Sequence, residues 1–564
     1  MKHKQAEYWL SLIFLLVLGG VFLLSAKKLW RSEDPAALPD GSVPFTVTAY
    51  SDAGEQTLEL WQEDARIWHL FLPAWAQPGR LELIPGDADT LELGGEVIDR
   101  PCFYPLEPGQ MPFRWKGRSD ECTLIVHQPP ADVATFHIET EGGVVDLLCD
   151  DKFASAPGRL EVLDAHGGTL YAGRLRDVRT RGNSSWYDCA KKSFQITTED
   201  PAGLFGMGQA RKWVLLANAT DRTYMRNQLA YQLALEAGVR NALESRPVEL
   251  YVDGQYQGLY LLCEKVEIGP DRIPIHDLEA ENERLNPELD FEALEQQITG
   301  TFDAPGSAYW FSLPAEPEDA TGGYLLELDL TQRRGDEKSS FVTDGGQDVV
   351  IKSPKYVTCG QADHIRAAWQ RLENAVCAPD GIDPVSGAHW TELADLASFA
   401  DKFIMEEFTQ NIDAVGSSQY FYKDRDSVDP KFYAGPPWDY DLSLGSRWRF
   451  VNMYHSDKQN PERLMLVEEE GFWPTLYGHE EFRQAVAAAY GERFVPVLER
   501  QIGQMDALTA WVQPHAMIDA ARWSPMSPAQ AEEDFAEQAA ILKDYVVRRT
   551  AWLENTWCSG ENNA

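Results

Sequence analysis

Apolar and polar residues alternate in short runs along the first quarter of the chain. Runs rich in β-branched and aromatic side chains, as in strands, lie at residues 45–50, 67–72, 81–83, 122–127 and 135–138. Turn residues separate these runs. Because short alternating strands at such intervals are typical of two stacked sheets, we expect a sandwich-like β-module over residues 40–141. It contains no catalytic constellation, so we interpret it as a binding or spacer module.

From residue 144 onward strand and helix patterns mix, which predicts an α+β domain over residues 144–560. Helical spacing of apolar residues predicts helices over residues 221–238, 393–411 and 480–557, the last with breaks at Pro514 and Pro525. Two strand-like runs flank Asp253-Gly254, and this arrangement predicts a β-hairpin.

The N-terminal 34 residues form an anchor and linker in this interpretation. Residues 8–26 carry no charge and are rich in Leu, Ile, Val and Phe. As a helix they would span roughly 28 Å, close to the thickness of the hydrocarbon core. We therefore expect an N-terminal transmembrane helix and an extracytoplasmic protein; a cleaved signal peptide is the alternative, but its cleavage pattern is weak.

Net charge limits the kinds of partner the chain can bind, and the cysteines limit the metal sites and disulfides it can form. The chain has 50 basic and 89 acidic residues, a net charge of −39, which argues against a nucleic-acid partner. The eight cysteines form no C-x-x-C pair, so a zinc ribbon is not expected. Disulfides Cys102–Cys122 and Cys359–Cys377 are plausible outside the cytoplasm, with buried free thiols as the alternative.

Two carboxylates stand two residues apart in the apolar segment 438–445. In a strand, Asp439 and Asp441 would project from the same face. Paired carboxylates next to a chain reversal suit Mg²⁺, which takes one or two carboxylates and completes its shell with phosphate oxygens. A polar turn that closes a strand is the alternative.

A glycine-containing loop supplies groups suited to phosphate. Its residues are Arg181, Gly182, Asn183, Ser184 and Ser185, and it follows a strand-like run. Such a loop can offer backbone N–H groups and a guanidinium to phosphate oxygens, although the same residues also make an ordinary turn.

Two lysines follow this loop. Lys192 shares a strand face with Phe194 and Ile196, so its ammonium would point inward and need an anionic partner such as phosphate. Lys191 is the second candidate, and solvated edge charges are the alternative for both. Further along, Asp413 stands where a helix meets a loop, a position from which a carboxylate can accept a hydroxyl proton.

Together these motifs resemble the CotH family, the spore-coat-type atypical protein kinases. The resemblance covers roughly residues 144–557. In chain order it rests on Arg181-Gly182-Asn183-Ser184-Ser185-Trp186, Lys191-Lys192-Ser193-Phe194, residues 211–218, Asp221 with Arg226-Asn227, residues 252–265, Asn411-x-Asp413 and Trp438-Asp439-Tyr440-Asp441.

The resemblance implies a divergent two-lobed protein-kinase fold that uses ATP and Mg²⁺ or Mn²⁺ to phosphorylate Ser or Thr. It implies that the residue 181–185 loop covers the phosphates and that Lys192, or Lys191, contacts them. It also places Glu264 near the nucleotide and lets Arg226 bridge to the site. Asp413 would be the catalytic aspartate, and Asp439 with Asp441 the metal-binding pair.

One position departs from the kinase pattern. Protein kinases place a metal-binding Asn five residues after the catalytic Asp, and here that residue is Ser418. A hydroxyl is a weaker ligand, so one-metal or reduced activity is expected. The alternatives are a surface adhesion or assembly protein that keeps the fold, and a nucleotidyl transferase. For a kinase, the acidic surface predicts a basic, Ser-rich protein substrate at the cell surface.

Overall fold

The computed structural model describes residues 44–52, 54–86, 91–115, 121–302, 304–448, 460–468 and 471–559. These residues form two compact units. The first ends at Gln128 and the second begins at Pro129, with residues 73–75 also in the second. The predicted membrane span at residues 8–26 lies outside the described residues. None of the described helices is both long enough and apolar enough to cross a membrane.

The first unit contains two sheets. One has the strand order β2 (Glu55–Leu58), β1 (Phe45–Tyr50), β5 (Leu81–Pro85), β8 (Cys102–Phe103). The other has the order β3 (Trp61–Gln62), β4 (Ile67–Phe71), β10 (Cys122–His127), β9 (Gly109–Trp115), β6 (Leu91–Leu93), β7 (Glu96–Ile98). Phe45 and Phe113 pack edge to face across the two sheets, with ring centroids 6.3 Å apart. The sheets therefore share a core, as alternating strands predict.

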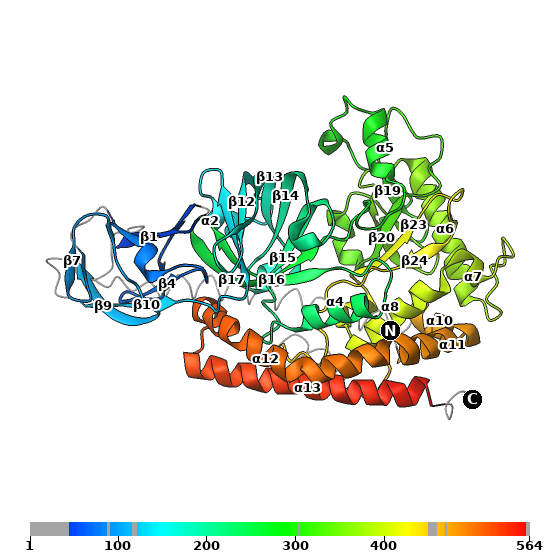
Figure 1. Cartoon of the computed structure of the whole chain (residues 1–564). Coiled ribbons are helices and arrows are strands. Elements are labelled where there is room, and N and C mark those ends of the chain that lie inside the picture. The colour runs from blue at the N-terminus through cyan, green and yellow to red at the C-terminus, as the bar shows by residue number, and fades with distance from the viewer. Residues whose placement is uncertain are drawn as a thin grey trace. The chain divides into compact units, whose positions relative to one another are not determined.

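A closed barrel begins the second unit (Figure 1). Its strands, in order around the barrel, are β11 (Ala134–Thr140), β12 (Ala156–Leu163), β13 (Thr169–Arg181), β14 (Ser193–Ala202), β15 (Ala210–Leu216), β17 (Gln255–Glu264) and β16 (Ser245–Val252). The predicted β-module over residues 40–141 included β11. Its antiparallel pairing with β12 and parallel pairing with β16 place it in the barrel instead. Alternation identifies a strand but does not identify its partners.

A seven-stranded sheet follows the barrel along the chain. Its order is β18 (Gln297–Thr299), β19 (Ala308–Trp310), β21 (Ser340–Val342), β22 (Asp348–Ser353), β20 (Tyr324–Leu328), β23 (Gln419–Lys423), β24 (Phe432–Ala434). Trp369 and Phe399, from two of the helices, pack on Phe421 of β23, which is fully buried. The sheet and the helices thus form one apolar core.

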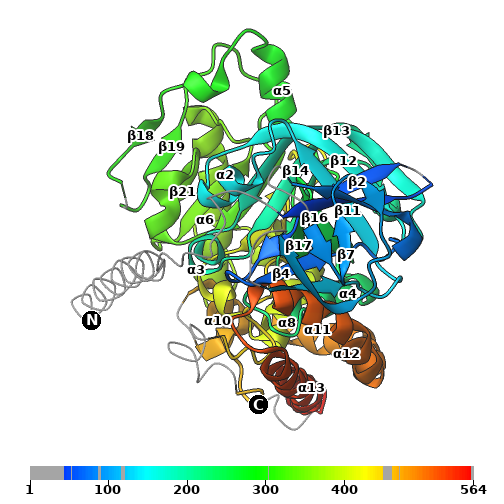
Figure 2. The same cartoon turned by 90° about the vertical axis from the view of Figure 1, so that its left-hand side faces the viewer.

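Helices complete the second unit. They include α2 (Val145–Asp150), α3 (Ser184–Asp188), α4 (Arg226–Glu236), α5 (Leu278–Leu285), α6 (Cys359–Cys377), α7 (Trp390–Leu393), α8 (Leu396–Thr409), α10 (Phe472–Tyr477), α11 (Glu480–Ala489), α12 (Val495–Trp523) and α13 (Pro528–Trp557). Figures 1 and 2 show α12 and α13 side by side beneath the barrel and the second sheet. The chain is therefore α+β, as expected.

Three sequence expectations need correction. Helix α12 continues through Pro514, so the predicted break there was wrong, because packing of the helix outweighs the local preference. Cys359 and Cys377 are the first and last residues of α6, about 27 Å apart along its axis, too far for a disulfide. Cys102 and Cys122 lie in β8 and β10, strands of different sheets, and the predicted disulfide between them is not formed.

Candidate functional site

A tight turn at Gly182 forms one wall of a cavity. Strand β13 ends at Arg181, and α3 begins at Ser184. Gly182 has φ +119°, and a Cβ at this position would lie 2.7 Å from Ser185 Oγ. Only glycine fits this turn without strain. The loop therefore brings its backbone and its small hydroxyl side chains to the cavity surface.

Asn411 joins two segments that carry carboxylates. Its side-chain oxygen accepts a hydrogen bond of 3.2 Å from the backbone N–H of Asp413, in the short 3₁₀ turn Ile412–Val415. Its Nδ2 donates to the backbone oxygen of Asp439 over 3.1 Å. Since Asn411 itself is fully buried, these bonds fix the turn that follows α8 against the Asp439 segment.

The segment that carries Asp439 and Asp441 is an irregular loop and not the predicted strand. Asp439 has φ +72°, Leu444 φ +49° and Gly445 φ +70°, values that interrupt an extended chain. The backbone N–H of Tyr440 donates to Asn227 Oδ1 over 2.8 Å and so anchors the loop on α4. Both carboxylates still face one cavity, because the loop curves around it.

Arg226 supports this loop from behind. It is 1% exposed, pairs with Asp221, and donates from Nε to the backbone oxygen of Ser443 over 3.0 Å. From the resemblance we expected the Arg226 side chain to reach the site. In the structure it holds the backbone two residues after Asp441 and does not itself line the cavity.

These segments meet at a cavity of about 270 Å³ between the barrel and the second sheet. The predicted residues that line it are Arg181, Gly182, Asn183, Ser184, Ser185, Lys191, Asp413, Ser418, Asp439 and Asp441. Of the predicted residues that the structure describes, Lys192, Arg226 and Glu264 lie outside the lining. Residues far apart in the sequence thus converge on one polar cavity.

Of the two candidate lysines, the second choice, Lys191, lines the cavity, and Lys192 does not. Lys192 donates to the backbone oxygens of Trp186 and, over 2.7 Å, of Cys189, so it fastens the α3 segment. Lys191 is 4% exposed and lines the cavity. The strand β14 begins at Ser193, so its alternation does not extend back to Lys192. The strand pattern therefore does not place the Lys192 side chain at the cavity.

Glu264 also has a different surrounding from the expected one. Its Oε1 accepts a 2.5 Å hydrogen bond from Arg272, and its Oε2 accepts one of 2.9 Å from the backbone N–H of Glu244. Desolvation outweighs these contacts and raises the pKa of Glu264 to about 7. The two hydrogen bonds tie the end of β17 to the Arg272 side chain and to the backbone of Glu244.

The electrostatics of the cavity favour a bound cation. Desolvation, followed by the charges of Asp439 and Asp441, raises the pKa of Asp413 well above its usual range. Desolvation and the charge of Asp439 raise the pKa of Asp441 to about 7. Arg181 and the Ser418 hydroxyl only partly offset the desolvation that raises the pKa of Asp439. The raised pKa values mean that the three carboxylates are costly to ionise together. A divalent cation in the cavity would stabilise their ionised forms.

The opposite wall carries charged side chains that were not among the predicted site residues. It presents Glu327, Asp329, Arg333, Glu337 and Lys352. Lys352 pairs with Glu327 over 3.1 Å and with Glu337 over 3.0 Å. Desolvation and the charge of Glu327 raise the pKa of Asp329 to about 6. Two acidic residues at the end of the apolar strand β20 were the available signal, the same kind that singled out Asp439 and Asp441.

The donor set suits a metal ion that phosphate helps to bind. Among the residues that the structure describes, no three His, Cys, Asp or Glu side chains are arranged to hold a metal by themselves. Asp439 and Asp441 supply two carboxylates, and Mg²⁺ commonly binds one or two of them and completes its shell with phosphate oxygens and water. The residues present therefore fit a metal that arrives with a phosphorylated ligand.

Comparison with known proteins identifies the family of the chain. No curated protein matches the chain. The family model described as CotH kinase protein matches residues 178–553, well over half of the 564 residues. The match begins in β13, just before the Gly182 loop, and ends in α13, so it contains every cavity residue named above. The chain belongs to the CotH kinase protein family.

Proposed function

We propose that this protein is an atypical protein kinase that transfers the γ-phosphoryl group of ATP to Ser or Thr of a surface or secreted protein. One observation carries the proposal. The Gly182 loop, Lys191, Asp413 and the Asp439–Asp441 pair line the same cavity, although they come from widely separated segments. Phosphoryl transfer depends on positioning and charge neutralisation, and these groups supply both.

Each group has a defined task in this proposal. The backbone of the residue 181–185 loop and the Arg181 guanidinium bind phosphate oxygens, and the Lys191 ammonium adds a positive charge. Asp413 orients the substrate hydroxyl and accepts its proton. Asp439 and Asp441 hold Mg²⁺ or Mn²⁺, which neutralises charge on the phosphates when bound. Ser418 stands beside Asp439 as a weak ligand.

The remaining expectations belong to this proposal as well. The barrel and the second sheet would be the two lobes of a divergent protein-kinase fold, with ATP between them. Residues 8–26 would anchor the chain in a membrane, with the enzyme on the extracytoplasmic side. The net charge of −39 supports a basic, Ser-rich protein as substrate.

A second candidate function is a surface adhesion or assembly protein of the same family. Ser418 favours it, because the position offers a hydroxyl where kinases use a metal-binding Asn. The separate β-module in front of residue 129 is consistent with an adhesive role. The proposal as a kinase has the greater support, because Lys191, Asp413, Asp439 and Asp441 are all present in the cavity.

Binding of nucleotide and metal tests the proposal. ATP is titrated into the full chain by calorimetry with Mg²⁺, with Mn²⁺ and with neither. We expect metal-dependent binding that Asp439→Asn abolishes. Asp383→Asn is the matched control, since Asp383 is also buried and lies outside the cavity. No binding by the wild type with either metal would contradict the proposal.

A further inference from the structure

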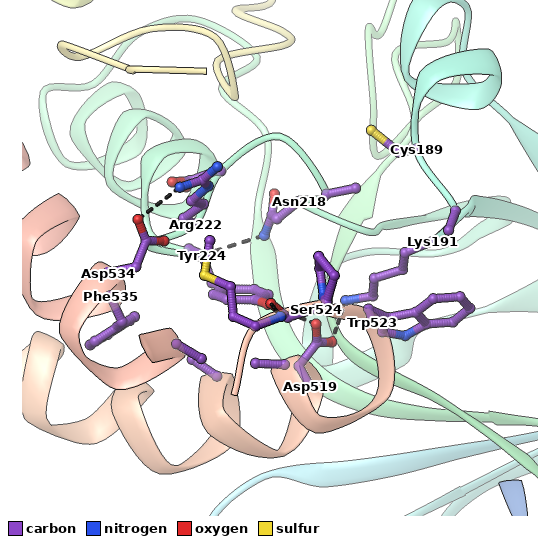
Figure 3. A pocket seen from close by; sticks show the side chains of 18 of the residues that line it. Cys189, Lys191, Asn218, Arg222, Tyr224, Asp519, Trp523, Ser524, Asp534 and Phe535 are labelled. Carbon is purple, nitrogen blue, oxygen red and sulfur yellow. Dashed lines mark hydrogen bonds and ion pairs between the residues drawn. The ribbon is translucent and has the colours of Figure 1, made fainter. Parts of the chain in front are cut away.

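A buried ion pair joins the cavity to the C-terminal helices. Lys191 Nζ donates to Asp519 Oδ1 over 2.5 Å, and the two side chains are 4% and 2% exposed. Figure 3 shows the two side chains pointing toward each other, with Asp519 on helix α12. They are 328 positions apart in the sequence. The contact therefore depends entirely on how α12 packs on the barrel.

Asp519 is surrounded by donors. Its Oδ1 also accepts 2.8 Å from the backbone N–H of Leu259, and its Oδ2 accepts 2.7 Å from the Tyr224 hydroxyl. Lys191 in turn donates to the backbone oxygen of Leu259 over 2.6 Å. Well-packed apolar residues often stabilise a core as much as such a pair does. Stability alone is therefore a poor reason for this arrangement.

The backbone next to the pair is shaped to accommodate it. Gly258 has φ +113°, and a Cβ there would lie 2.0 Å from Asp519 Oδ1 and 3.0 Å from Lys191 Cε. No other residue fits at this place without displacing one of the two charges. A glycine in the middle of β17 weakens the strand, so the close approach is the feature that it permits.

Lys191 faces the cavity while it holds Asp519. Lys191 lines the cavity of about 270 Å³ that contains Asp413, Asp439 and Asp441. It also lines a second cavity of about 330 Å³, whose lining includes Asp519 and Trp523. Its ammonium has three donors, and the described residues supply two acceptors, Asp519 and the Leu259 oxygen. Lys191 Nζ also lies 4.5 Å from the centre of the Tyr260 ring, and its third N–H has no oxygen acceptor among the described residues, so this is the group that would bind a phosphate oxygen.

We propose that Asp519 is a positioning residue that holds the Lys191 ammonium at the wall of the nucleotide cavity, so that helix α12 is part of the nucleotide site. This inference rests on the proposed function. Asp519 touches no substrate; it acts through Lys191. Tyr224, which also binds Asp519, immediately precedes Met225 and helix α4, whose Arg226 supports the Asp439 loop. Asp519 thus binds Lys191 directly and is connected to the Asp439 loop through Tyr224 and the start of α4.

A purely structural tether is the competing explanation, and the chain offers a matched control for it. His515 lies one turn earlier on α12, is fully buried, and bonds through Nδ1 to Glu249 Oε1 over 2.8 Å. It also fixes α12 on the barrel, because Glu249 belongs to β16. His515 lies outside the lining of both cavities.

The test measures the Kd for MgATP, kcat, KM and Tm of the full chain for Asp519→Asn and His515→Gln. We expect Asp519→Asn to weaken MgATP binding by about 10- to 100-fold, the range found for residues that orient metal-binding side chains. We expect His515→Gln to lower Tm to a similar extent and to leave the Kd within about twofold, because His515 lines neither cavity and does not bind Lys191. In a Lys191→Met background, Asp519→Asn has no further effect on the Kd.

Three results decide between the explanations. If the wild type binds MgATP and Asp519→Asn binds it equally well, the inference is overturned and the proposed function stands. An equal weakening by Asp519→Asn with and without Lys191 also overturns it. If the wild type binds no MgATP, the proposed function fails and this inference with it. Should Asp519→Asn not fold, Tyr224→Phe removes one hydrogen bond to Asp519 and is expected to weaken binding in the same direction by less.

Discussion

The hydroxyl of Ser418 donates a 3.3 Å hydrogen bond to Oδ2 of Asp439. Ser418 follows Asp413 by five residues, the position at which protein kinases carry a metal-binding Asn. Its φ of +56° is in the left-handed region, which Asn adopts more readily than Ser does. The backbone at this position therefore suits the residue that the kinase pattern would place there.

Ser418→Asn is expected to raise turnover or to lower the metal concentration required for half-maximal activity. An amide carbonyl is a better metal ligand than a hydroxyl, and the backbone accepts Asn without strain. Titration of Mg²⁺ and Mn²⁺ against wild type and variant measures the effect. Identical titration curves would show that position 418 does not bind metal.

Asp439→Asn is expected to abolish turnover with little change in Tm. Asn also tolerates the φ of +72° at this position, so the loop keeps its shape. The loss of formal charge next to the metal removes on the order of several kcal/mol of transition-state stabilisation. Single-turnover kinetics at saturating Mg²⁺ measure it. Unchanged turnover would contradict the metal-site assignment and favour the adhesion function.

Lys191→Met is expected to reduce kcat/KM on the order of 100-fold, the effect of losing one fixed charge at a reacting phosphate. Lys192→Met is the matched control and has a smaller effect, since Lys192 binds backbone oxygens outside the cavity. Steady-state kinetics of the two variants decide between them. A larger loss in Lys192→Met would restore the interpretation drawn from the strand pattern.

His515 predicts a pH dependence of stability. Burial alone would lower the pKa of His515, but the hydrogen bond and charge of Glu249, with those of Asp132, raise it above its usual 6.5. A raised pKa stabilises the fold fully below pH 6.5, and this contribution is lost as the pH rises through the folded value. The Tyr256 hydroxyl also donates a hydrogen bond to Glu249, so the Glu249 carboxylate faces both Tyr256 and His515.

The measurement compares the Tm of wild type and His515→Gln between about pH 5.5 and about pH 9. The advantage of the wild type is expected to be largest at the acidic end and to shrink as the pH rises. An advantage that grows with pH would contradict the assignment of a charged His515 between Glu249 and Asp132.

Local features of the fold were predictable from the sequence. The turn Asp253-Gly254 joins β16 and β17 with φ values of +51° and +78°, as the hairpin prediction requires. The predicted helix at residues 221–238 is α4, which begins at Arg226 because Asp221 binds the Arg226 N–H instead of capping an earlier turn. These features depend on residues close together in the chain.

Long-range features were not predictable in this way. The parallel pairing of β11 with β16 closes the barrel, and nothing in either strand names its partner. The pairing of Lys191 with Asp519 depends on the packing of a helix that follows it by more than 300 residues. Motifs identified Asp413, Asp439 and Asp441. The charged wall around Lys352 is assembled by tertiary structure, and its one local signal was the acidic pair Glu327 and Asp329 at the end of β20.

The most direct test of the central claim is transfer of label from ATP to protein. The full chain is incubated with a basic, Ser-rich protein, Mg²⁺ or Mn²⁺, and ATP labelled in parallel reactions at the γ- or the α-phosphate. Asp413→Ala is the inactive control. We predict label on Ser or Thr from γ-labelled ATP alone, with none in the control. Label from α-labelled ATP would indicate nucleotidyl transfer, and no label from either, despite MgATP binding, would contradict the kinase function.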